Sequence, residues 1–212
     1  QLATYIGADD GRPAWSPDGQ WIAYFQGDET KYLAYDINKL AIIPAAGGAP
    51  KVLTAALDRP VSGQISWSPD GKTLTFTVSD DRTEYVGRTT TAGGTVEKLT
   101  TGRHTVSNVT LGADGHLTLL AGTAARTPEV HALEGAALRT LTRVNDALLA
   151  GLQLATTADF TSKSKDGTVV NGLIVKPASY TAGTKYPTLL VIHGGPNGQD
   201  EHCYQDQHHC LL

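Results

Sequence analysis

The sequence contains no methionine and only two cysteines, Cys203 and Cys210, both within the last ten residues. Disulfides through the body of the protein are therefore excluded. An unprocessed gene product begins with methionine, whereas this chain begins with Gln1, so we expect a processed product or a fragment. An amino-terminal targeting signal would precede Gln1, and the sequence therefore assigns no compartment.

Long apolar runs and dense charge of one sign are also missing. The apolar run from Leu189 to Ile192 is far shorter than the roughly 20 residues that a membrane-spanning helix requires. The formal net charge is −4, and lysine and arginine are nowhere adjacent to one another. Binding to a nucleic acid or to a membrane is therefore not expected. We also expect no cofactor.

The composition favours short strands joined by tight turns. Hydrophobic residues make up 40% of the chain and charged residues 18%, which is enough apolar material for a folded core. The 23 glycines and 10 prolines are a larger share than usual, and both residues punctuate turns. Threonine, which favours strands, is frequent. A mainly β fold follows from this composition.

An internal repeat organises the first two thirds of the chain. Residues 14–24 recur as residues 66–76, and both copies contain the sequence Trp-Ser-Pro-Asp-Gly, which begins at Trp15 and at Trp67. A degenerate third copy spans residues 110–119. We therefore expect turns at Ser16–Gly19, Ser68–Gly71 and Ala113–Gly115.

Each repeat predicts two hairpins. In Ser-Pro-Asp-Gly the proline sets the backbone of the turn, the aspartate bonds nearby N–H groups, and the glycine leads into the next strand. A Gly-Gly element in the same phase predicts a second turn within residues 46–54, 92–100 and, in a weaker version, 133–142. Two hairpins make a four-stranded antiparallel sheet, which is the blade of a β-propeller.

The strand that follows the second Ser-Pro-Asp-Gly turn alternates in polarity. Apolar residues (Leu74, Phe76 and Val78) alternate with threonines (Thr73, Thr75 and Thr77). An alternation with a period of two predicts a strand that is buried on one face and exposed on the other.

These motifs resemble the repeat of TolB-type propellers, in which a strand ends in Trp-Ser-Pro-Asp-Gly. The resemblance covers about residues 13–142, and it implies that Trp15 and Trp67 are scaffold residues in the core. Propellers close with about four to eight blades, and fewer blades leave sheet edges unpaired. We therefore expect the chain to begin partway through a larger propeller.

A different pattern follows the repeat. Residues 144–157 are a last strand or a connector, and two strands then flank the turn Asp166-Gly167. The apolar run Thr188–Ile192 ends in His193-Gly194-Gly195-Pro196. A continuous apolar run that ends in glycines is typical of a central strand covered on both faces.

This order resembles the start of the α/β-hydrolase domain in the prolyl oligopeptidase family of serine peptidases. Within that family it is most similar to the acylaminoacyl-peptidase branch, in which a propeller precedes the hydrolase domain. We therefore expect β-propeller blades over residues 1–157 and the first strands of an α/β-hydrolase domain over residues 158–212. The resemblance implies hydrolysis of short peptides or acyl-peptides, with the propeller restricting access to the site.

The glycines after the apolar run suit acyl transfer. Negative charge develops on a carbonyl oxygen in this reaction, and fixed backbone N–H groups stabilise it. Glycines let the backbone approach the acyl carbon. By resemblance, the backbone N–H of Gly195 is the oxyanion-hole donor, and His193, Gly194 and Pro196 shape the loop. The alternative is that the glycines form only a tight turn at the end of a strand.

The nucleophile of this family is missing from the sequence. Gly-x-Ser-x-Gly, the motif that carries the serine, occurs nowhere in the 212 residues. The chain also ends 17 residues after Gly195, and no triad aspartate or histidine can follow the serine. We therefore expect no catalytic residue in this chain and no hydrolase activity from the chain alone.

The last residues depart from the expected pattern. A helix should follow the glycine loop, but the apolar residues after Glu201 do not recur at helical spacing. Four residues are weak candidates for a zinc site: Cys203, His208, His209 and Cys210. Their spacing fits no usual structural zinc site, so we expect no metal and interpret the tail from about residue 201 as non-native.

Other polar residues give weaker signals. Related peptidases use paired acids to hold the amino terminus of a substrate, but no pattern around Asp28-Glu29 or Asp80-Asp81 matches theirs, and both pairs are interpreted as solvated loop charge. His104 and His116 are expected in a loop and a turn.

Three functions compete. The first is part of a serine peptidase, with a peptide or acyl-peptide substrate and with a further hydrolase segment or a second copy of the chain as partner. The second is a non-enzymatic TolB-type propeller that binds a protein or peptide, and the third is a scaffold with a metal-binding tail. The segment 159–196 favours the first, because a pure propeller has no use for a strand covered on both faces.

Overall fold

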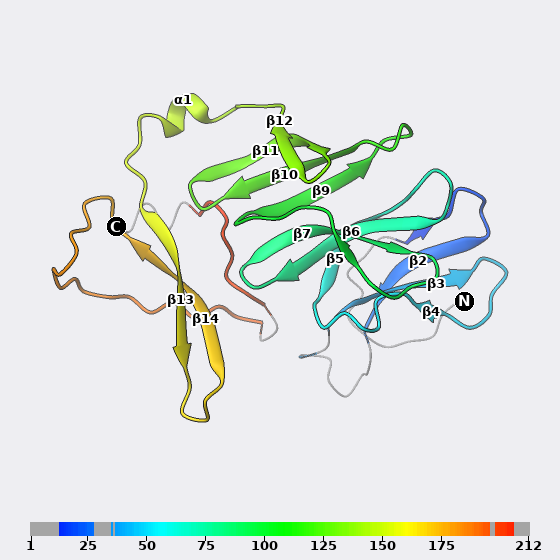
Figure 1. The fold of residues 1–212 in the computed structure, drawn as a ribbon, viewed down its shortest axis with the longest axis horizontal. Coiled ribbons are helices and arrows are strands. Elements are labelled where there is room, and N and C mark those ends of the chain that lie inside the picture. The colour runs from blue at the N-terminus through cyan, green and yellow to red at the C-terminus, as the bar shows by residue number, and fades with distance from the viewer. Residues whose placement is uncertain (1–12, 28–34, 36, 196–197, 206–212) are drawn as a thin grey trace.

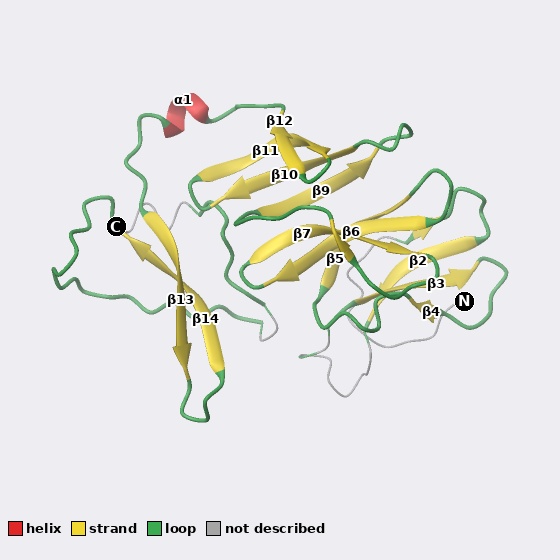
Figure 2. Cartoon of the chain, in the orientation of Figure 1, coloured by secondary structure: helices red, strands yellow, loops and turns green. Residues whose placement is uncertain are grey.

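The computed structural model describes residues 13–27, 35, 37–195 and 198–205, and the structural statements below concern these residues. Three four-stranded antiparallel sheets follow one another along the chain, and a separate two-stranded hairpin comes after them (Figures 1 and 2). In each of the three sheets the strands pair in their order along the chain. The expected mainly β fold with four-stranded blades is therefore confirmed.

The three sheets are the blades. The first blade consists of β1 (Ala14–Trp15), β2 (Trp21–Gln26), β3 (Lys39–Pro44) and β4 (Lys51–Val52). The second blade consists of β5 (Val61–Trp67), β6 (Thr73–Asp80), β7 (Thr83–Thr90) and β8 (Glu97–Lys98). The third blade consists of β9 (Thr105–Leu111), β10 (Leu117–Thr123), β11 (Arg126–Glu134) and β12 (Ala137–Thr140).

The Ser-Pro-Asp-Gly turns form as the sequence predicts. In the first blade the Ser16 hydroxyl donates to Asp18 Oδ1 at 2.6 Å and accepts from the Trp21 N–H at 2.9 Å. Ser68 and Asp70 repeat the same donation at 2.6 Å in the second blade. Gly71 has a φ of 69°, which a residue with a side chain rarely adopts. These local bonds place the turns at the predicted positions.

The strand β6 is buried on both faces, so the prediction of a half-buried strand is wrong. Leu74, Phe76 and Val78 lie in a cluster with apolar residues of the first blade. On the opposite face, Thr75 and Thr77 are each only 3% exposed. The second blade lies between the first and the third (Figure 1). Both faces of its central strand are therefore covered, which the sequence of the strand alone does not reveal.

The two equivalent tryptophans lie in different surroundings. Trp67 packs against the core cluster between the first two blades, and its indole N–H donates to the carbonyl oxygen of Ala14 at 3.0 Å. Trp15 occupies the same position of the first blade but is 62% exposed. The expectation that Trp15 is a core residue is therefore wrong, because no described sheet covers the outer face of the first blade.

A connector and a hairpin follow the third blade. The short helix α1 (Asp146–Leu149) lies in the connector, where the sequence predicted a last strand or a connector. The strands β13 (Thr156–Lys163) and β14 (Val169–Lys176) then pair over their whole length. Gly167, with a φ of 89°, lies in the turn between them. The hairpin around Asp166-Gly167 is therefore confirmed.

The buried central strand predicted at Thr188–Ile192 is not formed. This segment has no regular secondary structure, and the exposed fractions of Leu189 and Ile192 are 75% and 79%. A strand needs neighbouring strands for its backbone hydrogen bonds, and none in the described part of the chain lies beside this segment. The prediction of a covered strand is therefore wrong for this structure.

In the described part of the chain, the four-residue α1 is far too short to span a bilayer, and no other helix is a candidate.

Candidate functional site

The loop expected to hold the oxyanion lies in irregular backbone after the hairpin. His193 and Gly194 are exposed, and His193 Nδ1 lies 2.8 Å from the Gly194 carbonyl oxygen. Gly195 has a φ of 145°, in the region that favours glycine. A side chain at Gly198 would approach the Gly194 carbonyl within 3.1 Å. Pro196 lies outside the described residues. The glycine backbone is thus open to solvent.

The chain after this loop returns to the propeller. We call Gln199–His202 the return segment. The backbone N–H of Arg82 donates to Gln199 Oε1 at 3.0 Å, and Gln199 Nε2 donates to the Thr83 carbonyl at 3.1 Å. The backbone N–H of His202 donates to the Arg82 carbonyl at 2.8 Å. The turn between β6 and β7 therefore binds the return segment through three backbone groups.

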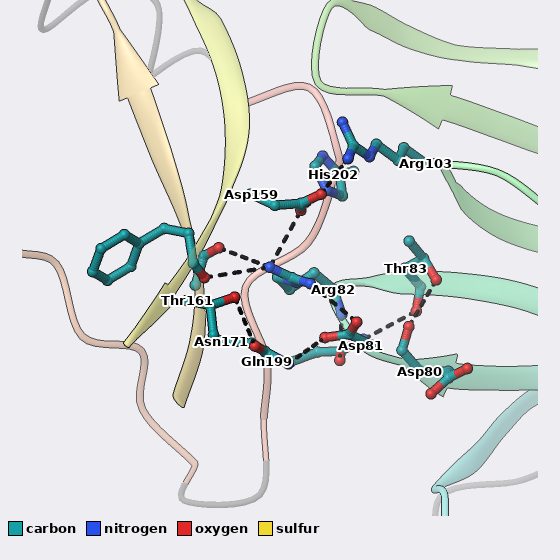
Figure 3. A network of polar contacts seen from close by, with 12 residues as sticks. Asp80, Asp81, Arg82, Thr83, Arg103, Asp159, Thr161, Asn171, Gln199 and His202 are labelled. Atoms are coloured by element: carbon teal, nitrogen blue, oxygen red, sulfur yellow. Dashed lines mark hydrogen bonds and ion pairs between the residues drawn. The ribbon is translucent and has the colours of Figure 1, made fainter. Parts of the chain in front are cut away.

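The same turn contacts the hairpin through the side chain of Arg82. Its Nη1 donates to the carbonyl of Gly172 at 3.1 Å and to that of Phe160 at 3.5 Å, and it lies 3.3 Å from Asp159 Oδ1 (Figure 3). The Arg82 side chain is only 13% exposed. Arg82 thus bridges the second blade, both strands of the hairpin and the return segment.

Three positively charged or titratable basic side chains surround the carboxylate of Asp159. His202 Nε2 lies 2.9 Å from its Oδ1, and Arg103 Nη2 lies 2.5 Å from its Oδ2, in addition to Arg82 (Figure 3). The hydrogen bond from His202 is the largest cause of a lowered pKa of Asp159, and the charges of Arg82 and Arg103 act in the same direction. The carboxylate therefore remains ionised at neutral pH.

The acidic pair Asp80-Asp81 belongs to this region and is not simply solvated charge. Asp80 forms ion pairs with Arg59 at 2.7 Å and with Lys98 at 3.5 Å. Asp81 lies 3.0 Å from Arg82 Nη2 and accepts from Asn171 Nδ2 of β14 at 2.9 Å. The interpretation as solvated loop charge is therefore wrong. The pair Asp28-Glu29 lies outside the described residues.

Two further acids are partly buried beside the return segment. Burial, with the neighbouring charge of Glu201, raises the pKa of Glu84 to about 7. Burial also raises the pKa of Glu201. A negative charge on Glu84 therefore opposes one on Glu201, and protonation of Glu84 relieves this repulsion.

The metal candidates are only partly described. Cys203 is a half-buried free thiol whose sulfur accepts from Gln205 Nε2 at 3.3 Å. His208, His209 and Cys210 lie outside the described residues. Within the described ranges, no group of three or more histidine, cysteine, aspartate or glutamate side chains could hold a metal ion. His116 is exposed in a turn, and burial lowers the pKa of His104.

Sequence reasoning missed Arg82, Asp159 and His202. These residues come from three separate parts of the chain, and no local motif connects them. The only signal was the polar sequence Asp80-Asp81-Arg82-Thr83 between two apolar strands.

No family model matches the chain. It is 28% identical to dipeptidyl-peptidase 5 of Porphyromonas gingivalis over 192 residues, which are 88% of this chain and 27% of that protein. It is 30% identical to the probable dipeptidyl-peptidase 5 of Aspergillus niger over 206 residues, which are 90% of this chain and 27% of that protein.

A solved acylaminoacyl peptidase has a similar fold. The enzyme of Pyrococcus horikoshii matches with a TM-score of 0.74 and 25% identity over 92% of this chain and 29% of its own. The chain thus spans between a quarter and a third of the length of each of these three proteins. The resemblance to the acylaminoacyl-peptidase branch of the prolyl oligopeptidase family is confirmed.

Proposed function

We propose that the chain supplies propeller blades and the first hydrolase hairpin of a serine peptidase similar to the prolyl oligopeptidases. The single observation that carries this is the order of the parts: blades, hairpin and glycine loop follow one another in a match covering 92% of the chain. We assign residues 1–157 to the propeller part and 158–212 to the hydrolase part, with the non-native tail beginning after His202, because His202 is buried and contacts Arg82 and Asp159. The last blade ends at Thr140 and β13 begins at Thr156, so the hydrolase hairpin begins two residues before this division.

The chemistry assigned to the glycine loop is oxyanion stabilisation. The backbone N–H of Gly195 donates to the oxygen that becomes negative when the substrate carbonyl is attacked. Gly194 and Gly195 leave room for the acyl group because neither has a side chain. His193, hydrogen-bonded to Gly194, and Pro196 shape the loop.

The serine, aspartate and histidine of the triad lie outside these 212 residues in this proposal. No Gly-x-Ser-x-Gly is present to supply the nucleophile. We infer that a further hydrolase segment, or a second copy of the chain, covers the apolar segment 189–192, because its side chains are exposed in this structure. The substrate is a short peptide or acyl-peptide, and the blades restrict its access to the site.

The test compares a product of the same gene that extends beyond Leu212 with its Gly195→Pro variant. Proline removes the backbone donor, so kcat for an acyl-peptide ester should fall by about 10²–10³-fold. Gly195→Ala, which keeps the N–H but meets the same unfavourable φ of 145°, is the matched control and should lose less activity than the proline variant. An extended product without turnover, or a Gly195→Pro variant as active as the control, would contradict the proposal.

A further inference from the structure

The turn between β6 and β7 is the one place in the described chain where the propeller holds both the hairpin and the segment after the glycine loop. Its residues Asp81 and Arg82 have φ values of 45° and 67°, although neither is glycine. Positive φ at both central residues is the geometry of a tight two-residue hairpin turn, which the pairing of Asp80 with Thr83 closes. The turn also contacts the return segment through Arg82 and Thr83, and the hairpin through Arg82.

The glycine loop depends on this anchor for its position. His193–Gly195 has no regular structure and is exposed. Gln199 comes four residues after Gly195, and a chain of four residues spans at most about 14 Å. The preceding fixed element, β14, ends at Lys176, much farther along the chain. The return segment is therefore the nearest fixed point of the loop.

We propose that Arg82 is a positioning residue that couples the propeller to the oxyanion loop. The expected effect of Arg82 on catalysis rests on the proposed function. The coupling between the propeller, the hairpin and the return segment does not. The backbone of Arg82 binds the return segment, and its guanidinium binds the hairpin through the carbonyls of Phe160 and Gly172. A movement of the propeller relative to the hairpin would break both sets of bonds together and release the loop.

The energetics of Arg82 favour a positioning role over a purely stabilising one. Among the described groups, its buried Nε has no hydrogen-bond partner. Removing a guanidinium from water is costly, and an incompletely paired one contributes little to stability. Its Nη1 nevertheless contacts three groups of β13 and β14, which fixes the geometry of the junction.

The first test measures hydrogen exchange in the 212-residue chain, where no catalysis is needed. Arg82→Gln keeps the backbone bonds of residue 82 to the return segment but removes the bonds of the guanidinium to the hairpin, including the ion pair with Asp159, which also contacts His202. If the two sets of bonds are coupled, exchange of the amides from Gly198 to Cys203 should become about tenfold faster. Exchange within β2, β3 and β10 should stay unchanged. Arg88→Gln is the matched control: Arg88 lies on β7, the strand that follows the turn, and its side chain pairs with the exposed Glu97, 2.8 Å away.

If Arg82→Gln does not fold, Asp159→Asn weakens the same junction from the hairpin side and should give the same local pattern. Unchanged exchange of residues 198–203 in a folded variant of either kind would overturn the coupling. Equal acceleration by Arg88→Gln would overturn it as well.

The second test uses the gene product that extends beyond Leu212, with active sites counted by titration with a fluorophosphonate. Arg82→Gln should lower kcat per active site about tenfold with KM changed less than twofold, and Arg82→Lys should restore part of the loss. An unchanged kcat would overturn the catalytic consequence. A different outcome is an inactive extended wild-type protein while Arg82→Gln still alters exchange in the 212-residue chain. That result would contradict the proposed function but would support the coupling.

Discussion

Trp67 of the second blade donates its indole N–H to the carbonyl oxygen of Ala14 in the first blade at a distance of 3.0 Å, although the two residues are 53 positions apart in the sequence. This bond joins two copies of the repeat. It also shows that Trp67 contributes to the contact with the preceding sheet, and not only to the packing of its own.

Replacing Trp67 with phenylalanine tests this bond. The ring remains, but the Ala14 carbonyl loses its partner, so the free energy of unfolding should fall by about 1–2 kcal/mol, including some lost volume. Trp15→Phe is the matched control and should change it by less than about 0.5 kcal/mol, because Trp15 is 62% exposed. Urea denaturation measures both. Equal losses would show that the two tryptophans have the same surroundings.

A threonine at the end of each blade forms the same hydrogen bond to the third strand. Thr54, Thr100 and Thr142 follow the three Gly-Gly elements of the repeat, and each hydroxyl oxygen accepts a backbone N–H of the third strand of its blade. Thr100 accepts from Val86 at 3.1 Å and is fully buried. The phase of the repeat in the sequence thus matches a repeated hydrogen bond.

Thr100→Val should therefore destabilise the chain. Valine has nearly the same shape but leaves the buried N–H of Val86 without a partner, which costs about 1–3 kcal/mol. The adjacent Thr101 is exposed, so Thr101→Val should have almost no effect on the midpoint of urea unfolding. A midpoint that moves equally in both variants would contradict this role of Thr100.

Stability should depend on pH through Glu84. Its pKa is raised from 4.5 to about 7, so the folded chain holds this proton more tightly than the unfolded chain. The stability that results is present in full below pH 4.5 and is lost as the pH rises through 7. Glu84→Gln should therefore stabilise the chain above pH 7 and lose this advantage near pH 4.5.

The free energy of unfolding of Glu84→Gln above pH 7 should exceed that of the wild type by about 1 kcal/mol, because solvent screens a partly exposed carboxylate. Unfolding by urea at a series of pH values measures it, and Glu97→Gln, which changes an exposed acid of the neighbouring strand, is the control. A gain that is the same at pH 4.5 and pH 8 would show that repulsion at Glu84 is not its cause.

The exposed apolar segment 189–192 should make the isolated chain associate. Leu189, Leu190, Val191 and Ile192 are each more than 60% exposed, and an uncovered apolar segment is an aggregation hazard. Light scattering over a dilution series should show a mass that rises with concentration. Leu190→Asp with Ile192→Asp should reduce this rise. A monodisperse monomer at high concentration would contradict the expectation.

The sequence predicted the parts of the fold that are encoded locally. The turns at Ser16–Gly19 and Ser68–Gly71 follow from bonds between residues two to five positions apart, which a motif contains. The hairpin around Asp166-Gly167 is local in the same sense. Such elements can be predicted from a short stretch of sequence, without knowledge of the rest of the molecule.

The errors concern features that depend on distant neighbours. The burial of Thr75 depends on the presence of the third blade. The exposure of Trp15 depends on whether another sheet covers the first blade. The strand predicted at 188–192 would need partner strands. The network joins Arg82 to residues of the hairpin and the return segment that lie 77 to 120 positions away, so no spacing in the sequence indicates it.

Labelling with a fluorophosphonate, followed by mapping of the modified residue, tests the central claim most directly. The 212-residue chain should remain unlabelled, because it contains no Gly-x-Ser-x-Gly. The product of the same gene that extends beyond Leu212 should be labelled at one serine outside these residues and should hydrolyse an acyl-peptide ester. Labelling at a defined serine within the 212 residues, or an extended product that neither labels nor hydrolyses the ester, would contradict the account.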